Sequence, residues 1–363
     1  MKNTFGNNLS VTLFGESHGE AIGCVIDGIA PGIKINMDYV QNCLMQRAAR
    51  SDISTPRKEA DEPIFLSGVK NGTTEGTPIC ILIKNENTNS ASYTDYEFTP
   101  RPAHADLTAE YKYHGYQDKA GGGHFSGRIT APLVAAGAII KCVLETRGIK
   151  IGTHIKSLHG IHDRDFDCYE KDTELLKTLL FPVLDSDVAD KMKKEILDAK
   201  ENLDSVGGVL ETVITSLPCG IGEPWFDTVE GVISHAVFSV PGVKGIEFGD
   251  GFAVTKKYGS EANDPFVFDG ETVITTKNSS GGILGGISNG MPVIFRTAMK
   301  PTPSIAKAQA TVDLKAGENT TISVKGRHDP AIIHRARAVI DAVSAIAIAD
   351  LLVTRFGTDF LKG

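Results

Sequence analysis

Apolar residues recur at every third or fourth position in four stretches of the chain, which is the spacing of an amphipathic helix. The first predicted helix follows Asn36, the second spans about residues 129–147, the third spans about residues 187–201, and the fourth begins at Asp329-Pro330. Gly148 is expected to end the second helix, because glycine readily adopts the left-handed conformation found after many helices. Aspartate followed by proline is preferred at a helix start, so a plain helix cap is the structural interpretation of Asp329.

Short runs rich in β-branched and apolar residues lie between these stretches and predict strands. They cover residues 10–14, 23–27, 78–83, 208–215, 292–297 and 320–324. Residues 66–72 resemble residues 284–290, and each segment precedes a strand-like run that begins with proline. We interpret this similarity as an internal repeat of two related halves in an α+β fold. No flexible linker separates the halves, so a single domain is expected over residues 1–363.

Composition narrows the class of protein. The chain has 363 residues, of which 41% are hydrophobic and 23% charged, so it is neither disordered nor collagen-like. The formal net charge is −8 without a basic stripe, so no nucleic-acid partner is expected. The longest apolar stretch, residues 131–140, is too short to cross a bilayer and no signal peptide is recognisable, so no membrane association is expected. Six cysteines without a CxxC pair predict free, mostly buried thiols in a reducing cytoplasm.

Residues 15–19 (GESHG) fit the G-x-S-x-G pattern of serine hydrolases. That pattern requires a helix directly after the serine, whereas residues 21–28 are strand-like. We therefore favour a turn at the end of a strand that presents Ser17 and His18 to a cleft. A histidine that only holds a loop is the structural alternative.

Four further segments combine cations, hydroxyl groups and glycines, as anion-binding sites do. They are residues 101–106 (RPAHAD), 121–128 (GGGHFSGR), 300–304 (KPTPS) and 326–330 (GRHDP). Arg101 and His104 lie on one proline-stiffened loop, which suits an anionic ligand and proton transfer. The structural alternative is that Asp106 caps a short helix and that Arg101 and His104 are surface residues. No HExxH motif or Cys/His cluster is present, so no metal site is expected.

Together these segments resemble the chorismate synthase family. The matching segments, in family order, are residues 14–19 (FGESHG), 101–106, 121–128, 243–247 (VKGIE), 281–286 (GGILGG), 300–302 (KPT) and 326–330. The resemblance extends from residue 5 to about residue 345, which is nearly the whole chain.

The resemblance implies a β-α-β sandwich subunit, usually in a homotetramer, that binds reduced FMN and 5-enolpyruvylshikimate 3-phosphate (EPSP). The implied reaction is the 1,4-elimination of phosphate to give chorismate, in the shikimate pathway of aromatic amino-acid biosynthesis, without net redox change. The electron-rich ring of reduced flavin can lend charge to the breaking C–O bond and recover it. No added flavin reductase segment is recognisable, so reduced flavin is expected from an external source and not from NADPH oxidised by this chain.

The resemblance also implies roles for individual residues. His18 would protonate or neutralise the departing phosphate, His104 would sit by the pyrimidine edge of the flavin, and Asp329 would act near flavin N5. Cofactor contacts would come from His124, Phe125, Ser126, Pro241, Gly242, Gly285, Lys300, Pro301, Thr302, Pro303, Ser304 and Arg327. Substrate contacts would come from Ser17, Arg47, Arg57 and Arg128, since the donor fork of arginine suits planar anions.

The sequence departs from the family pattern in two places. Many members carry an arginine-rich stretch after the first helix, where residues 44–50 here read LMQRAAR. Gln46 and Ala48 therefore replace cations, and Asp52 lies where another arginine is often found. His124 stands where an arginine is more usual. Two alternatives to the lyase remain open, a serine hydrolase that uses Ser17 and a flavin-binding relative without lyase activity.

Overall fold

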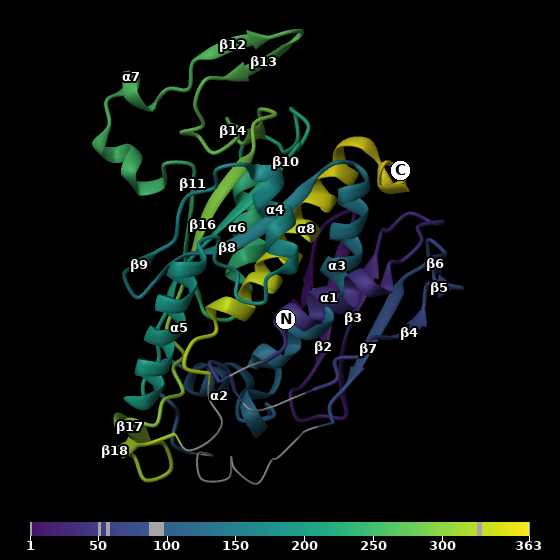
Figure 1. Cartoon of the computed structure of the whole chain (residues 1–363). Helices are drawn as coiled ribbons and strands as arrows, with labels where there is room; N and C mark the ends of the chain where they lie inside the picture. Colours follow the sequence, from purple (N-terminus) through teal and green to yellow (C-terminus); the bar gives the residue numbers. More distant parts are fainter. Residues whose placement is uncertain (1, 50–51, 56–58, 87–97, 325–328, 363) are drawn as a thin grey trace.

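Two antiparallel five-stranded sheets enclose a layer of helices in the computed structural model (Figure 1). The structure describes residues 2–49, 52–55, 59–86, 98–324 and 329–362. The N-terminal sheet contains, in spatial order, β1 (Thr4–Phe5), β2 (Ser10–Gly15), β3 (Ala21–Asp27), β7 (Ile79–Lys84) and β4 (Ile64–Ser67). The C-terminal sheet contains β11 (Val243–Phe248), β16 (Val293–Met299), β10 (Gly208–Thr215), β8 (Lys150–Leu158) and β9 (Ile161–His162).

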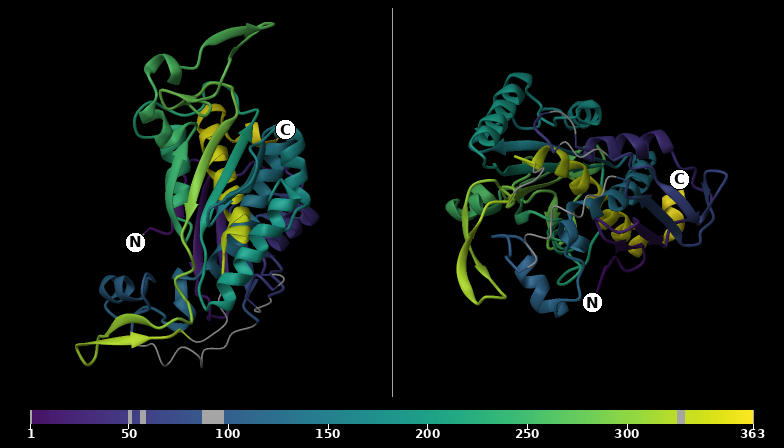
Figure 2. Two further views of the ribbon diagram at one scale, coloured as in Figure 1. Left: turned by 60° about the vertical axis from the view of Figure 1, so that its left-hand side comes forward. Right: turned by 90° about the horizontal axis from the view of Figure 1, so that it is seen from below.

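Four two-stranded hairpins extend from this body. They are β5 (Val69–Lys70) with β6 (Thr73–Thr74), β12 (Phe266–Asp269) with β13 (Thr272–Thr275), β14 (Ile283–Leu284) with β15 (Ile287–Ser288), and β17 (Gln309–Asp313) with β18 (Glu318–Ile322). Figure 2 shows β12–β13 and β17–β18 projecting from opposite ends of the molecule.

Some of the described helices form the layer between the sheets, and others lie outside it. Their bounds are α1 (Met37–Arg47), α2 (Asp106–Tyr113), α3 (Thr130–Thr146), α4 (Tyr169–Thr178), α5 (Ser186–Glu201), α6 (Val229–Phe238), α7 (Gly259–Ala262) and α8 (Ile333–Phe356). The helix α3 packs on β3 and β7, α8 packs on β8 and β10, and the two helices contact each other. The fold is therefore the β-α-β sandwich of the α+β class that the sequence predicted.

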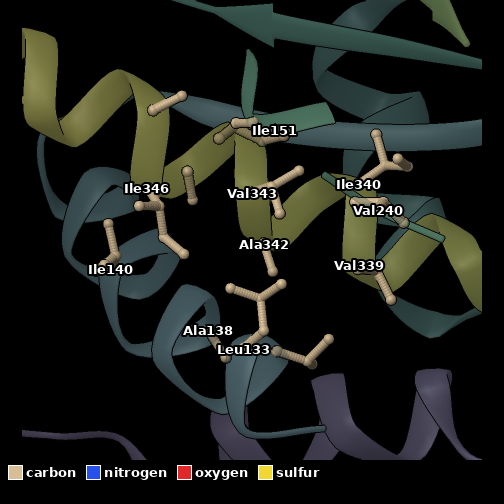
Figure 3. Packing of buried hydrophobic residues seen from close by; sticks show 14 of the residues in the cluster. Leu133, Ala138, Ile140, Ile151, Val240, Val339, Ile340, Ala342, Val343 and Ile346 are labelled. Carbon is tan, nitrogen blue, oxygen red and sulfur yellow. The ribbon is translucent and has the colours of Figure 1, made fainter. Parts of the chain in front are cut away.

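The contact between α3 and α8 forms the centre of the hydrophobic core (Figure 3). The helices approach closely at Gly137, where an added Cβ would lie 2.3 Å from the Cβ of Ala342. A buried ion pair crosses the same interface, since Lys141 Nζ donates to Asp341 Oδ2 at 2.6 Å. Asp341 Oδ1 also accepts from Thr153 Oγ1 of β8 at 2.6 Å, so the carboxylate of the buried pair has a second partner in the C-terminal sheet.

The two halves of the chain repeat one topology. The first half runs β2, β3, α1, β4, β7, α3, and the second runs β8, β10, α6, β11, β16, α8, with further elements between them that include α4 and α5 in the second half. The corresponding strands also occupy corresponding places, in the orders β2-β3-β7-β4 and β8-β10-β16-β11. The internal repeat predicted from residues 66–72 and 284–290 is thus visible in the order of the elements.

Most predicted elements are present with small shifts at their ends. Asn36 caps α1, because its side chain accepts a hydrogen bond from Tyr39 N at 3.0 Å. The predicted start of the fourth helix was wrong: α8 begins at Ile333, and Asp329 is not its cap. The carboxylate of Asp329 instead accepts hydrogen bonds from Thr55 N and from the side chain of Arg335.

The helical stretch Gly127–Thr146 is 20 residues long and apolar enough, by length and composition alone, to cross a membrane. However, 83% of its most apolar window is buried inside the protein, as expected for a core helix. All six cysteines are free thiols, as predicted. The expectation that most are buried was wrong, since only Cys24 is buried, four are partly exposed and Cys219 is exposed.

Candidate active site

A cavity of about 1290 Å³ lies between β2, α3, α6 and α8. The loops that contain residues 103–105, 121–128, 241–244 and 300–303 complete its wall. Among the described residues, six cationic side chains line it: Lys2, Arg47, Arg128, Lys244, Lys300 and Arg335. The other ionisable side chains in the wall are His104, His124, His235, Glu59, Asp61 and Asp329. Segments that are distant in the sequence are thereby brought to one cationic cavity.

The glycine triplet lies between the two histidines predicted as catalytic. Gly121 has a φ of 63°, and a Cβ added there would lie 1.9 Å from the Cε1 of His18. A Cβ on Gly122 would lie 3.6 Å from the Cε1 of His104. Gly121 and His104 line the cavity, whereas His18 lies directly behind Gly121. The close approach of the loop to the His18 ring therefore requires glycine at position 121.

Ser17 occupies the turn between β2 and β3 and is buried. Its Oγ lies 3.0 Å from His18 Nδ1, and its backbone N–H donates to Gly123 O at 3.1 Å. The serine is followed by a strand and not by a helix, so the arrangement lacks the nucleophile elbow of serine hydrolases. Ser17 and His18 instead fasten the turn to the glycine triplet.

His124, Phe125 and Ser126 all line the cavity, as the sequence predicted for cofactor contacts. His124 Nδ1 lies 2.8 Å from Gly15 O, and because a carbonyl oxygen only accepts, Nδ1 carries the proton. The Phe125 ring packs edge-on against Tyr113, with ring centroids 5.9 Å apart. Ser126 Oγ accepts from Arg128 N at 3.3 Å at the start of the turn that leads into α3.

Arg47 and Arg128 are both buried in the cavity wall and share the carboxylate of Asp61. Arg47 also donates to Thr130 Oγ1 at 2.9 Å and to Gly127 O at 3.0 Å. Arg128 donates to Asn85 Oδ1 at 3.0 Å and to Lys84 O at 3.2 Å. Burial lowers the pKa of Arg47 to about 9, although Asp61 counteracts this effect. The two guanidinium groups are thus held in fixed positions by protein acceptors.

The segment 300–304 forms one wall together with Pro241 and Gly242. Lys300 N donates to Gly242 O at 2.9 Å, and Lys300 Nζ donates to Ala103 O at 2.6 Å. Burial and then the nearby charge of Lys244 lower the pKa of Lys300. Pro301 and Pro303 line the cavity, while Thr302 and Ser304 lie in the same turn behind them. Thr302 Oγ1 is buried and has no hydrogen-bond partner among the described residues.

Asp329 also lines the cavity and pairs with Arg335 at 3.1 Å. Its Oδ1 accepts from Thr55 N at 2.9 Å. Arg335 Nε donates to Arg47 O at 3.0 Å, so Arg335 connects the segment around Asp329 to the C-terminal end of α1.

The structure does not bring every predicted site residue to the cavity. Gly285 lies in the turn of the β14–β15 hairpin and is not part of the cavity wall. Arg57 and Arg327 lie outside the described residues. Gln46, one of the departures from the family pattern, is buried and donates to Lys177 O at 2.8 Å, away from the cavity wall.

Sequence reasoning missed Asp61, Lys244 and Arg335 as residues of the cavity wall. Lys244 lies within a segment matched to the family but carried no assigned role. Arg335 lies on the predicted fourth helix, where only the apolar face was considered. Asp61 had no local signal, because its importance comes from two arginines that are 14 and 67 residues away in the chain.

A large cationic cavity with several imidazole groups and a carboxylate defines an enzyme site for a multiply charged anionic small molecule. The comparisons with known proteins agree with this class. The family model for chorismate synthase matches residues 9–353. The chain is 45% identical to a chorismate synthase of Pyrococcus abyssi over 350 residues, covering 96% of this chain and 97% of that protein. It is 45% identical to a chorismate synthase of Lachnoclostridium phytofermentans over 363 residues, covering 99% and 98%.

A crystal structure of chorismate synthase superimposes on this fold with a TM-score of 0.77 and 27% sequence identity, covering 98% of this chain and 95% of the other. The chain belongs to the chorismate synthase family. It is a carbon–oxygen lyase that eliminates phosphate from EPSP to give chorismate in aromatic amino-acid biosynthesis.

Proposed function

We propose that the lyase reaction takes place in the cavity described above and depends on reduced FMN without net redox change. The strongest support is that six cations, three histidines and Asp329 line one cavity. Its volume of about 1290 Å³ exceeds the roughly 300–1,000 Å³ of ordinary small-molecule sites, so a flavin and EPSP can be held together.

The residues present fit a flavin phosphate and ring. The wall offers backbone N–H groups at glycines and the neighbouring cations Lys244 and Lys300. Behind the wall, Thr302 Oγ1 is buried and has no hydrogen-bond partner among the described residues. The residues proposed to hold FMN are His124, Phe125, Ser126, Pro241, Gly242, Lys300, Pro301, Thr302, Pro303 and Ser304. Arg327 and Gly285 complete the proposed set; Arg327 lies outside the described residues, and Gly285 lies in a separate hairpin.

When bound, reduced FMN supplies an electron-rich ring that stabilises charge as the C–O bond breaks. The protein residues bind, orient and transfer protons around it. His18 is proposed to protonate or neutralise the departing phosphate, with its ring fixed by Ser17 Oγ at 3.0 Å. His104 and Asp329, which both line the cavity, are proposed to hold or move protons there.

EPSP carries a phosphate and carboxylate groups, and we propose that Ser17, Arg47, Arg57 and Arg128 lie on its side of the cavity. Arg47 and Arg128 have most of their donors engaged by protein acceptors, so their contribution is a fixed positive potential in the wall. Such a preorganised field costs no rearrangement when the charged substrate arrives.

We also propose that the protein functions as a cytoplasmic homotetramer supplied with reduced flavin by another source. Large aromatic side chains stand exposed in the C-terminal half, including Trp225 at 85%, Phe226 at 93%, Phe252 at 80% and Phe268 at 81%. Exposed apolar surface of this kind is typical of an interface between subunits.

An anaerobic assay tests the proposal. The protein is incubated with EPSP and chemically reduced FMN, with oxidised FMN as the control, and chorismate and phosphate are measured together. Equal release of both products only with reduced FMN is expected. Equal turnover with oxidised FMN would contradict the need for the reduced form, and rapid oxidation of NADPH by the protein with FMN would contradict an external flavin source.

A further inference from the structure

The β17–β18 hairpin holds the segment that leads into the loop with His104. The hairpin lies at the end of the molecule that also contains α2 (Figure 1). Leu314 N, directly after β17, donates to Phe98 O at 2.9 Å. Thr311 Oγ1, within β17, donates to Pro100 O at 2.6 Å. The chain that enters the loop is therefore fixed to this hairpin by two hydrogen bonds.

The hairpin is stiff where it contacts this segment. Asp313 fixes its turn, since Asp313 Oδ1 accepts from Lys315 N at 2.8 Å and from Ala316 N at 2.9 Å. Lys315 Nζ lies 5.4 Å from the centre of the Phe98 ring, and Lys119 Nζ lies at the same distance from it. A cation over an aromatic ring is attracted to it, so Phe98 also connects the hairpin to the segment just before the glycine triplet.

The loop is closed by hydrogen bonds within residues 101–106. Arg101 is buried; its N and Nε donate to Asp106 Oδ2 at 3.0 Å and 2.8 Å, and its Nη2 donates to Oδ1 at 2.8 Å. His104 N donates to Arg101 O at 3.2 Å. These contacts exclude the structural alternative in which Asp106 caps α2 and Arg101 lies at the surface. A displacement of Arg101 therefore moves His104 with it.

The loop also contains strained backbone. Ala103 has a φ of 58°, in the left-handed region that residues other than glycine rarely adopt. Such a conformation persists only where the surrounding structure holds it. One hold is the hydrogen bond from Lys300 Nζ to Ala103 O at 2.6 Å. The other is at Pro100, which is buried and whose carbonyl has Thr311 as its only donor in the part of the chain that the structure describes.

We propose that Thr311 is a positioning residue that keeps the loop with His104 in place at the cavity. Its hydroxyl group acts through Pro100 and Arg101, since Thr311 itself is not part of the described cavity wall. Without this donor, the buried carbonyl of Pro100 is unsatisfied, which makes the present position of the loop unfavourable. The consequence for turnover rests on the proposed function, whereas the position of the loop does not.

Three variants isolate the hydroxyl group. Thr311→Val removes it and keeps a β-branched side chain that suits a strand. Thr311→Ser keeps the hydroxyl group and is expected to keep the hydrogen bond to Pro100 O. The matched control is Thr321→Val, at an exposed position on β18 of the same hairpin. Circular dichroism is expected to show unchanged secondary structure in all three.

Hydrogen–deuterium exchange of the ligand-free protein, read by mass spectrometry, measures the loop without any turnover. The readout is the peptide with residues 101–106, in which the N–H groups of Arg101 and His104 are hydrogen-bonded. We expect this peptide to exchange at least about threefold faster in Thr311→Val than in the wild type, Thr311→Ser and Thr321→Val. Unchanged exchange in Thr311→Val, or equal acceleration in Thr321→Val, would overturn the inference.

Steady-state kinetics with reduced FMN test the consequence. We expect Thr311→Val to lower kcat about tenfold while KM stays within about threefold, because a proton-transferring group is displaced and the cations of the cavity wall stay in place. Thr311→Ser should recover most of the wild-type kcat, and Thr321→Val should leave kcat unchanged.

A double variant distinguishes positioning from general damage. If Thr311 acts through His104, adding Thr311→Val to His104→Gln causes little further loss of kcat. Fully multiplicative losses would overturn the inference. Faster exchange of the loop with an unchanged kcat would support the positioning by Thr311 but would contradict the proposed role of His104 in the reaction.

Discussion

Asp61 shows how a single residue can decide the charge of a cavity wall. It is buried between Arg47 and Arg128 and accepts from both guanidinium groups. Two buried cations without a counter-charge would be strongly unfavourable. Asp61 therefore allows the protein to fold with a fixed cationic wall before any ligand is bound.

Replacing Asp61 by Asn is expected to lower the free energy of unfolding by about 3 kcal/mol, because both buried cations lose their counter-charge. Asparagine tolerates the local backbone, whose φ is 51°, so strain does not contribute. Urea denaturation measures the loss, which inorganic phosphate in the cavity is expected to reduce. The control Asp165→Asn breaks an exposed pair with Lys156 and is expected to cost less than about 1 kcal/mol; an equal cost for both variants would contradict the argument.

His334 couples folding to pH from a buried position on α8. Its Nε2 lies 2.8 Å from Ser54 Oγ, and burial, then the charge of Arg335, lowers its pKa from 6.5 to about 4. The unfolded chain therefore binds the proton more tightly between these pH values, and the free energy of unfolding falls as the pH decreases from about 6.5 to about 4.

We expect this residue to contribute about 3 kcal/mol to the difference in unfolding free energy between pH 7 and pH 4. Urea denaturation of wild type and His334→Gln at several pH values isolates this contribution, because the part of their difference in unfolding free energy that changes with pH is due to His334. His162, which is exposed, provides the control variant His162→Gln. If the difference in unfolding free energy between wild type and His334→Gln is constant from pH 4 to pH 7, His334 is not the group that couples folding to pH.

At the scale of elements, the sequence predicted features that are local in the chain. The cap at Asn36 and the ends of α3 and α5 depend on residues within a few positions, and they were predicted closely. The start of α8 was mispredicted because Asp329 is engaged by Thr55 and Arg335, which no local pattern reveals. The strand β8 was missed because Thr153 and His154 are polar yet buried, and their partners come from other elements.

The candidate site follows the same rule. Cations, histidines and glycines that share one short segment, such as residues 121–128, were predicted as site residues, and they line the cavity. Asp61 and Arg335 act through partners far away in the sequence, so their roles required the fold. Gly285 was assigned by resemblance alone, and its contact with the cofactor stays a prediction.

The variant Gly121→Ala tests whether the glycine triplet is needed for the position of His18. The added Cβ would meet the His18 ring at 1.9 Å, so His18 must move, and we expect kcat to fall at least about tenfold. Gly72→Ala is the matched control, because Gly72 has a similar φ of 74° but no neighbour within 4 Å of an added Cβ. Both variants share the backbone strain of a positive φ, and Gly121→Ala is expected to lose more stability because only it adds a clash. Only Gly121→Ala should lose activity, and equal kcat values would contradict the proposed function of His18.

The contact between α3 and α8 gives a prediction opposite to helix propensity. Alanine is a better helix former than glycine by about 1 kcal/mol, yet Gly137→Ala places a Cβ 2.3 Å from that of Ala342. We expect a net destabilisation of about 1–3 kcal/mol in thermal or urea denaturation. Adding Ala342→Gly should recover only part of the loss, because the Cα of residue 342 would still lie 2.5 Å from the added Cβ. A stabilised Gly137→Ala would show that the helices separate easily.

At the scale of the whole molecule, the β12–β13 hairpin projects from the body (Figure 2). Several of its apolar side chains are exposed. Phe266 and Phe268 are 64% and 81% exposed. If these rings lie in an interface of the proposed homotetramer, the double variant Phe266→Lys with Phe268→Lys should sediment as a smaller species. Circular dichroism should show unchanged secondary structure, and Phe268→Tyr should sediment as the wild type. An unchanged mass of the double variant would place the interface elsewhere.

The cavity also depends on the whole molecule, since α3 of the first half and α8 of the second both contribute to its wall. The expectation of one domain over residues 1–363 stays a prediction, and it agrees with the hydrophobic cluster that includes residues of both sheets.

The repeated topology has a consequence for the origin of the chain. Two halves with the same order of strands and helices are what the duplication and fusion of an ancestral gene for one sheet and one core helix would leave. In the ancestral protein, the apolar face of the core helix would have packed against the same helix of a second copy, as α3 and α8 now pack against each other. A modern chain divided after Gly148 should then give two fragments that associate with each other, because each exposes a helix that the other fragment buries.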